Sequence, residues 1–232
     1  MRRLLSALIL ACSLAATGHA AAQTPATTTT VTGIPLDAPW KATIYAFARE
    51  HFHHPAWGWQ HSERDYQLAM ECAKGDGLAV DTDVLFAAAM LHDMAAFPPF
   101  EEPKTEHGDV AAIKSAPILR DAGFPMAKFP AVQAAMREHM YYTKVGTIPE
   151  AIVLHDADSL DFLGAAGAAR MLALTGESKS SVQPAIKALR SFVTDIPPKL
   201  VTRTAKRMGA ERAAELARFL DSLRDETFNA TI

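Results

Sequence analysis

The chain has 232 residues, of which 49% are hydrophobic and 21% charged, and its formal net charge is −3. This length and composition are typical of one globular domain and exclude a largely disordered chain. The mildly acidic balance and the lack of a basic tract argue against a nucleic-acid polymer as a partner.

The first 22 residues have the build of a secretory signal peptide. Arg2 and Arg3 precede a short apolar run, and small residues then form an A-x-A cleavage site before Gln23. The apolar run is too short for a comfortable transmembrane helix. We therefore expect a periplasmic or secreted protein with no stable membrane insertion after cleavage. Cys12 leaves a lipoprotein as the alternative, although Leu10 fits a lipobox poorly.

Removal of residues 1–22 changes the charge and the cysteine count. It would leave 21 Lys and Arg against 26 Asp and Glu, a net charge of −5, and one cysteine, Cys72. An exported chain with a single cysteine cannot form an internal disulfide. Stability must then come from core packing, with a bound metal as a further contribution.

The rest of the chain reads as an arm followed by helices. Residues 23–36 are rich in Thr and carry two prolines, which predicts a flexible arm. From about residue 37 onward, apolar residues recur at helical spacing, and no alternating run predicts a sheet. Helices are predicted over residues 38–52, 61–77, 84–93, 108–123, 127–142 and 148–176, and two more follow a loop near 176–181, the last over 209–228. We predict an all-α, single-domain bundle of about seven to nine helices over residues 37–232.

One predicted helix ends in a way that indicates metal binding. The segment over 84–93 is apolar until it finishes in the adjacent His92 and Asp93. Neutral imidazoles and carboxylates together bind divalent transition metals well, and two ligands at a helix end can reach one ion. Asp156 lies in an equally apolar context, where an unpartnered carboxylate is costly. Metal coordination would remove that cost.

With His61 added, these residues reproduce the order H…HD…D, and the chain resembles the HD-domain metal-dependent phosphohydrolases. Three segments carry the resemblance: "HSERDYQLAMECA", "LFAAAMLHDM" and "LHDADSLDFLGAAGAAR". The third is similar to the DAD-x-LD-x-x-GA-x-G-x-x-R segment of bacterial HD hydrolases that act on nucleotides. The resemblance spans roughly residues 40–175, and ordered ligands within matching helices make it far more specific than an isolated HD dipeptide.

The resemblance implies one or two divalent metal ions per chain, of Mn, Fe, Ni, Zn, Co or Mg. The first ion would be bound by His61, His92, Asp93 and Asp156. In the extended form H…HD…H…H…D, His107 and His139 would bind a second ion, with Asp93 bridging the two. In members with one metal, residues at these places contact phosphate or act as acid or base.

The implied reaction is attack on phosphorus by a metal-activated water. The resemblance implies catalytic roles for His61 and Asp93 and a small phosphoester, such as a nucleotide, as the substrate. Their proximity in sequence makes Arg64, Lys104 or Lys114 the basic residues expected to offset charge on the phosphoryl oxygens, and Arg64 is the one assigned a catalytic role. The loop after the HD pair departs from the family, because "MAAFPPFEEPK" carries no charge before Glu101. Two alternatives therefore stay open. One is a di-iron HD oxygenase that oxidises a C–H bond with O2, and the other is a non-catalytic metal-holding domain.

Several neighbouring residues are expected to support the site rather than bind the metal. Asp158 and Asp161 are interpreted as structural, with Asp158 hydrogen-bonded to backbone groups or to metal-bound imidazoles. His54 is expected at the mouth of the pocket. Trp40, Trp57 and Trp59 could stack on a base, although core or rim packing is the usual role of such residues.

Overall fold

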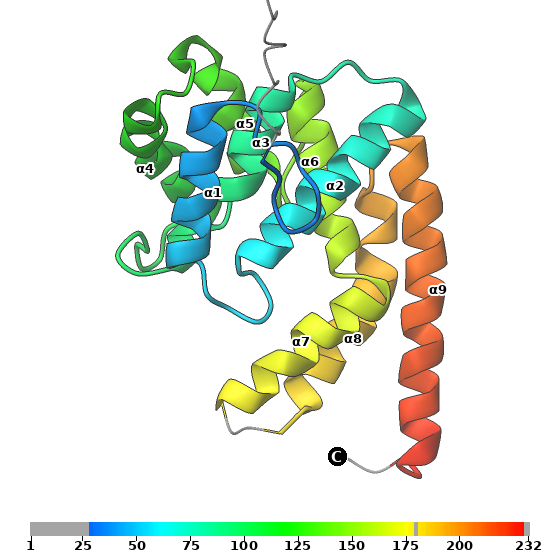
Figure 1. The fold of residues 1–232 in the computed structure, drawn as a ribbon. Helices are drawn as coiled ribbons and strands as arrows, with labels where there is room; N and C mark the ends of the chain where they lie inside the picture. Colours follow the sequence, from blue (N-terminus) through cyan, green and yellow to red (C-terminus); the bar gives the residue numbers. More distant parts are fainter. Residues whose placement is uncertain (1–27, 179–180, 230–232) are drawn as a thin grey trace, which may run out of the picture.

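The structure is a computed structural model that describes residues 28–178 and 181–229, so the predicted signal peptide over residues 1–22 lies outside the described part. That part contains nine α-helices, and it has no strand beyond an isolated bridge between Thr29 and Pro35. This confirms the prediction of an all-α bundle of seven to nine helices (Figure 1). None of the described helices is both long and apolar enough to cross a membrane.

The α-helices are, in chain order, α1 Pro39–His51, α2 Trp59–Asp76, α3 Thr82–Leu91, α4 His107–Ala122, α5 Phe129–Glu138, α6 Pro149–Asp161, α7 Gly164–Ser178, α8 Gln183–Asp195 and α9 Arg203–Glu226. Three short 3-10 helices lie between them: η1 Met94–Ala96, η2 Met126–Lys128 and η3 Pro197–Lys199.

Helix α3 is the centre of the bundle. Every residue from Val84 to Leu91 is buried, so this helix meets apolar neighbours on all sides. Its start is fixed by Asp81, whose side chain accepts hydrogen bonds from the backbone N–H groups of Asp83 and Val84. Helices α1, α2, α5 and α6 pack around it, and α2 also packs along α6. The end of α3 is therefore held rigidly inside the protein.

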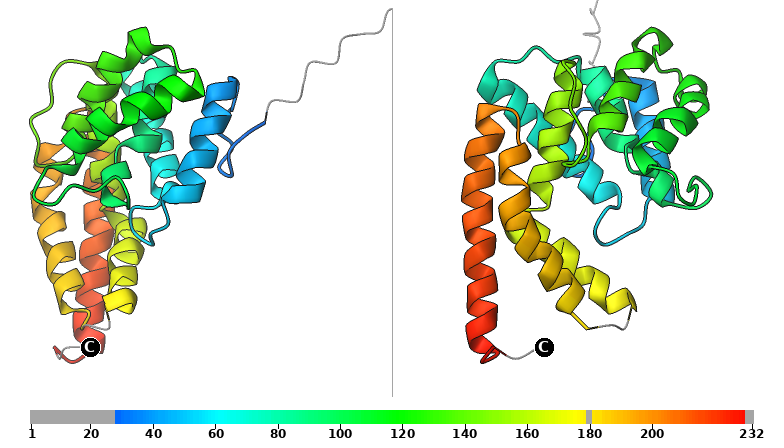
Figure 2. Two further views of the ribbon diagram at one scale, coloured as in Figure 1. Left: turned by 90° about the vertical axis from the view of Figure 1, so that its left-hand side faces the viewer. Right: turned by 180° about the vertical axis from the view of Figure 1, so that it is seen from behind.

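Helices α7, α8 and α9 pack on one another and extend away from the group formed by α1 to α5 (Figures 1 and 2). Helix α9 begins at Arg203, earlier than the predicted residue 209, because the Thr202 hydroxyl caps it by accepting from the Ala205 N–H. It also packs against α2 and α6, which joins the extension to the rest of the bundle.

The single long helix predicted over 148–176 is wrong, because the structure has two helices there. Helix α6 ends at Asp161 and α7 starts at Gly164, whose φ of +68° is a left-handed conformation that glycine adopts readily. A Cβ on Gly167 would come within 2.1 Å of the Phe162 carbonyl oxygen, so the turn is also tight. The break sends α7 away from the axis of α6.

The predicted arm over 23–36 is described only from residue 28, and this part packs on the bundle. Thr30 and Ile34 are buried, and the Val31 N–H donates to the Tyr45 hydroxyl at 3.1 Å. Residues 28–36 therefore belong to the folded domain, in contrast to the flexible arm that composition predicts.

Candidate metal centre

Four imidazoles converge beside the end of α3. His61 lies in the first turn of α2, His92 follows α3, His107 begins α4 and His139 follows α5. His61, His92 and His139 are at most 1% exposed, whereas the side chain of His107 is 28% exposed. Helices far apart in the chain therefore bring one imidazole each to a single place.

Each imidazole has its Nδ1 atom paired with an oxygen. The partners are the Asp161 carboxylate at 2.8 Å for His61, the Ala89 carbonyl at 2.9 Å for His92, the Glu106 carboxylate at 2.9 Å for His107 and the Met136 carbonyl at 2.6 Å for His139. Carbonyl and ionised carboxylate oxygens only accept, so Nδ1 carries the proton and donates. When the rings are neutral, the Nε2 atoms are left as lone-pair donors facing the cluster, which is the usual arrangement of metal-binding histidines, whereas without a metal His107 and His139 share a proton between Nε2 atoms 3.0 Å apart.

Asp93 lies between two pairs of these imidazoles. Its Oδ2 is 3.4 Å from His92 Nε2 and 3.6 Å from His61 Nε2. Its Oδ1 is 3.3 Å from His107 Nε2 and 3.6 Å from His139 Nε2. One carboxylate thus faces both halves of the cluster, which is the position that a ligand bridging two ions requires.

The structure does not bring Asp156 to the cluster, so its predicted place in the ligand set is corrected. Its carboxylate accepts from the Val201 N–H at 2.7 Å and the Thr202 N–H at 2.8 Å, at the start of α9. Asp158 takes that place, with Oδ1 at 3.2 Å from His61 Nε2. Two residues correspond to about 200° of rotation on a helix, so the two side chains leave opposite faces of α6.

Asp65 joins the cluster without having been predicted. It lies one turn after His61 on α2, is 0% exposed, and places Oδ2 at 3.1 Å from His61 Nε2. The sequence could have indicated Asp65, because residues four positions apart, such as His61 and Asp65, share a helix face. The acidic "SERD" stretch reads as a solvent-facing first turn, and only the packing of α2 shows that this face is buried.

The unpartnered atoms in this cluster test whether a metal fits. His61 Nε2, His92 Nε2, Asp158 Oδ2 and both oxygens of Asp65 are buried, and none has a hydrogen bond within the described residues. Such atoms are rare in folded proteins unless a water or an ion satisfies them. Two groups each offer donor atoms within 4.8 Å of one another: His61, Asp65, His92 and Asp158, and then His92, Asp93 and His139. The described residues therefore fit one or two metal ions.

The pKa values of the clustered residues also indicate a site for a cation. Burial opposes charge on His92, but Asp93 and the other carboxylates outweigh it and raise the pKa of His92 to about 10. Burial raises the pKa of Asp65 to about 7. The pKa of Asp93 is held well below its usual value, despite burial, by His92, His107 and His139. So much negative charge around the imidazoles is what a cation would offset.

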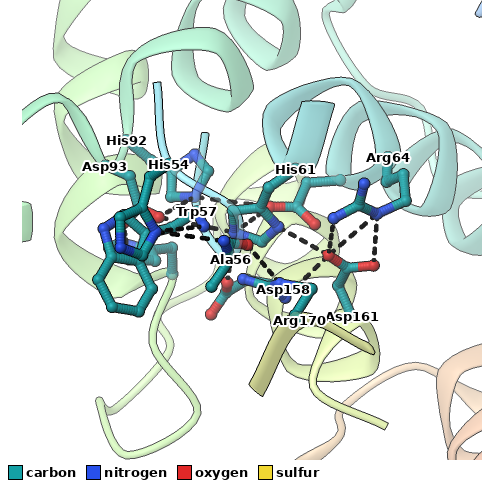
Figure 3. Close-up of polar contacts among 12 residues, drawn as sticks. His54, Ala56, Trp57, His61, Arg64, His92, Asp93, Asp158, Asp161 and Arg170 are labelled. Carbon is teal, nitrogen blue, oxygen red and sulfur yellow. Dashed lines mark hydrogen bonds and ion pairs between the residues drawn. The ribbon is translucent and has the colours of Figure 1, made fainter. Parts of the chain in front are cut away.

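Arg64, predicted to be catalytic, does not face the cluster. Its Nε and Nη2 donate to Asp161 at 2.9 Å each, on the side of Asp161 away from Asp158 and Trp57 (Figure 3). The cation nearer the cluster is Arg170 of α7, which is 5% exposed and pairs with the same Asp161 at 2.8 Å. Arg64 therefore positions His61 through Asp161, and Arg170 is the arginine beside the cavity.

A cavity of about 310 Å³ opens onto the cluster. It is lined by Asp93, His107 and Asp158 together with Trp57, Ala96, Met140, Phe162, Arg170 and Met171. The Trp57 ring stacks on His54 at a centroid distance of 3.7 Å, and Arg170 Nε donates to the Ala56 carbonyl (Figure 3). The loop that carries Trp57 is thus tied to Arg170, and His54 supports this wall from behind.

Comparisons with known proteins agree with this architecture. Residues 58–163 match the family model of the HD domain. A solved structure from Lactobacillus plantarum is similar with a TM-score of 0.63 and 22% identity, covering 82% of this chain and 97% of that one. Bacillus subtilis YpgQ in complex with ADP has a TM-score of 0.61 and 19% identity, covering 80% and 97%. An HD-superfamily hydrolase from Bacillus thuringiensis has a TM-score of 0.58 and 20% identity, covering 82% and 97%. No curated protein sequence matches this chain significantly.

Proposed function

Residues 58–163 of this chain form an HD domain, and from this premise we propose that the protein is a metal-dependent hydrolase of small phosphoesters. The observation that carries the proposal is the set of four imidazoles, each with Nδ1 paired and Nε2 facing the carboxylates of Asp93 and Asp158. The fold is that of the HD-superfamily hydrolases, and HD domains bind divalent metals. The reaction and the substrate are our inference.

The residues that would hold the metal are His61, His92, Asp93 and Asp158. A bound divalent ion would supply an activated water and offset negative charge on the phosphoryl oxygens. Asp161 keeps the proton of His61 on Nδ1 and so keeps Nε2 free for the metal. The apolar side chains of Phe162, Met140 and Met171 would exclude bulk water from the reacting group.

Two further side chains would act on the substrate directly. Arg170 lines the cavity and would pair with a phosphoryl oxygen. His107 also lines the cavity, and although burial opposes it, Asp93 and Glu106 raise its pKa. In a one-metal form, a protonated His107 could donate its proton to the leaving oxygen.

A nucleoside phosphate is the first substrate class to test. The chain shares its fold with Bacillus subtilis YpgQ, which has been solved in complex with ADP. In this chain Trp57 and Phe162 offer aromatic surface beside Arg170, which suits a base or another flat apolar group attached to a phosphate.

The direct experiment is elemental analysis of the purified protein, expressed with its leader, followed by a phosphoester panel. We expect one or two equivalents of metal per chain and release of phosphate from at least one nucleoside phosphate. Asp93→Ala and His61→Ala should lose the metal and at least 100-fold of the activity while the helical circular dichroism persists. Stoichiometric metal in both variants would contradict the proposed site.

A second candidate is supported by the two-sided position of Asp93. Its contacts with His61 and His92 on one side and with His107 and His139 on the other would suit a di-iron centre. The cavity, whose lining has Arg170 as its one cation among the described residues, would suit an uncharged substrate with an oxidisable C–H bond. Two equivalents of iron and substrate-dependent O2 consumption would favour this oxygenase over the hydrolase.

We also propose that the protein is exported, on the basis of residues 1–22 alone. The expected mature chain starts at Gln23 and is found in the periplasm or the medium. Mass spectrometry of the native protein tests this, and a lipid-modified start at Cys12 would replace it with the lipoprotein alternative.

A further inference from the structure

Asp65 is a buried carboxylate that the H…HD…D pattern does not include. It is 0% exposed, and its Oδ2 lies 3.1 Å from His61 Nε2 and 3.5 Å from His92 Nε2. Neither oxygen of Asp65 accepts a hydrogen bond from the described residues. A carboxylate taken out of water without donors or a cation is strongly destabilising.

Other buried carboxylates of this protein have the partners that Asp65 lacks. Asp156 accepts from two backbone N–H groups at the start of α9. Asp161 accepts from His61 and Arg64 and pairs with Arg170. Asp65 differs from them because both of its oxygens are buried and unpartnered among the described residues, whereas Glu63 and Asp158 each lack a partner at one oxygen only, and this points to a ligand that the amino-acid chain itself does not supply.

The atoms nearest to Asp65 explain which ligand fits. His61 and His92 both donate through Nδ1, to Asp161 and to the Ala89 carbonyl. When these rings are neutral, as metal binding requires, they turn Nε2 lone pairs toward a carboxylate that also has only lone pairs to offer. Such electron-pair donors, 3.1 to 3.5 Å apart, need a cation or a proton between them, and a metal ion can serve both imidazoles and the carboxylate at once. In a six-coordinate complex with metal–ligand bonds of about 2.1 Å, adjacent ligand atoms lie about 3 Å apart.

We propose that Asp65 is a direct ligand of the first metal ion, an inference that rests on the proposed metal centre. The ligands of this ion would then be His61, Asp65, His92 and Asp158, whose donor atoms all lie within 4.8 Å of one another, with Asp93 Oδ2, at 3.4 and 3.6 Å from the two imidazoles, as the fifth. Five protein ligands with a majority of hard oxygen donors favour a six-coordinate ion such as Mn²⁺ or Fe²⁺ over tetrahedral Zn²⁺. Asp93 and Asp158 line the cavity, so a bound ion would be reached by substrate or water from that side.

The test compares wild type with Asp65→Asn, which keeps the shape, and Asp65→Val, which removes the buried polar group. Glu63→Gln is the matched control, since Glu63 is also buried on α2 with an unpartnered Oε1 but belongs to neither ligand group. Each chain is stripped with EDTA and titrated with Mn²⁺. We expect at least a tenfold loss of Mn²⁺ affinity in both Asp65 variants and less than a twofold change in Glu63→Gln.

Two more readouts separate a ligand from a structural residue. In EDTA, Asp65→Val should melt at the same or a higher temperature than wild type, because it removes an unpartnered buried carboxylate. With Co²⁺, the Asp65 variants should absorb visible light more strongly than wild type, because loss of a ligand lowers the coordination number. Unchanged Mn²⁺ affinity and Co²⁺ spectrum in both variants would overturn the assignment of Asp65.

The same experiment distinguishes this failure from failure of the proposed function. If wild type binds no Mn²⁺, Fe²⁺, Co²⁺ or Zn²⁺, the metal centre and the Asp65 proposal both fail. If wild type binds metal and the Asp65 variants lose it, but no phosphoester is hydrolysed, the proposed reaction fails and Asp65 remains a ligand.

Discussion

Asp156 and Asp158 lie two positions apart on α6 and contact different parts of the protein. Asp158 reaches His61 at 3.2 Å, whereas Asp156 holds the backbone at the start of α9. The helical rotation between them makes the two carboxylates a natural matched pair of variants. One tests the site and the other tests the support of a neighbouring helix.

Asp158→Asn is expected to lose the metal, and Asp156→Asn is expected to keep it. The first change removes a ligand, which should lower metal affinity at least tenfold. The second removes a charged acceptor from the Val201 and Thr202 N–H groups and should lower the free energy of unfolding by about 1–3 kcal/mol. Elemental analysis and thermal unfolding of both variants check this. Equal metal loss in the two would show that Asp156 belongs to the ligand set after all.

The choice between Asp156 and Asp158 could not be made from the sequence. "DAD" places two acids on opposite faces of one helix, and only the packing of α6 against α2 shows which face meets His61. The HD pair could be found, because an apolar helix that ends in His92 and Asp93 is unusual whatever the packing. Asp65 was missed because its surroundings in sequence are polar although its surroundings in space are not.

At the level of helices, apolar periodicity predicted nearly every element but missed the break between α6 and α7. The spacing of apolar residues continues through 148–176, so periodicity alone gives one helix where α6 and α7 are separate. Gly164 was the residue that could have indicated this break. The break shapes the candidate site, because it sets Asp161 at the end of α6, where it contacts His61, and Arg170 within α7, where it pairs with Asp161.

Gly164→Ala should destabilise the protein, with Gly176→Ala as its control. Gly164 has a φ of +68°, and a Cβ there would approach Glu215 Oε2 at 3.0 Å and Arg212 Cγ at 3.3 Å. We expect a loss of about 1–2 kcal/mol. Gly176 has open space around it and lies in α7, so alanine there should be neutral or stabilising by up to about 1 kcal/mol. Chemical denaturation curves of the two variants decide this.

The contact between the end of α2 and the start of α9 should weaken in acid. The Asp76 carboxylate accepts from the Thr204 hydroxyl and N–H and from the Arg203 N–H, and these bonds lower its pKa to about 2. Because the folded-state pKa lies below the ordinary value, the stabilisation is complete above about pH 4 and is lost as the pH falls toward 2.

Asp76→Asn is therefore expected to lower the melting temperature at pH 7 by a few degrees and to flatten its dependence on pH between 5 and 2. Asp121→Asn, on the exposed surface of α4, is the control and should keep the wild-type profile. A parallel pH profile for Asp76→Asn and wild type would contradict the assigned role.

For the whole molecule, the metal is expected to act as a cross-link among five helices. The candidate ligands come from α2, α6 and the ends or starts of α3, α4 and α5. Within residues 28–178 and 181–229 no disulfide does this, since Cys72 is buried and free.

Removal of the metal should lower thermal stability in a concentration-dependent way. An ion at 100 times its dissociation constant stabilises the folded state by about 2.7 kcal/mol. For a domain of this size we expect a rise in melting temperature of about 5–10 °C when Mn²⁺ is returned to EDTA-treated protein. Differential scanning calorimetry over a Mn²⁺ series measures it. A melting temperature that is independent of Mn²⁺ would show that the ion does not hold the helices together.

The stacking of Trp57 on His54 also has a practical consequence. Trp57 lines the cavity with one neighbour fixed at 3.7 Å, so its fluorescence should respond when a compound enters and changes its surroundings. The two other tryptophans are Trp40, buried between Phe86 and Phe124, and Trp59, packed on Tyr45 and Arg49. Replacing both with Phe would leave a single emitter on the cavity wall. Compounds could then be screened by light emission alone, including those that the protein binds but does not convert.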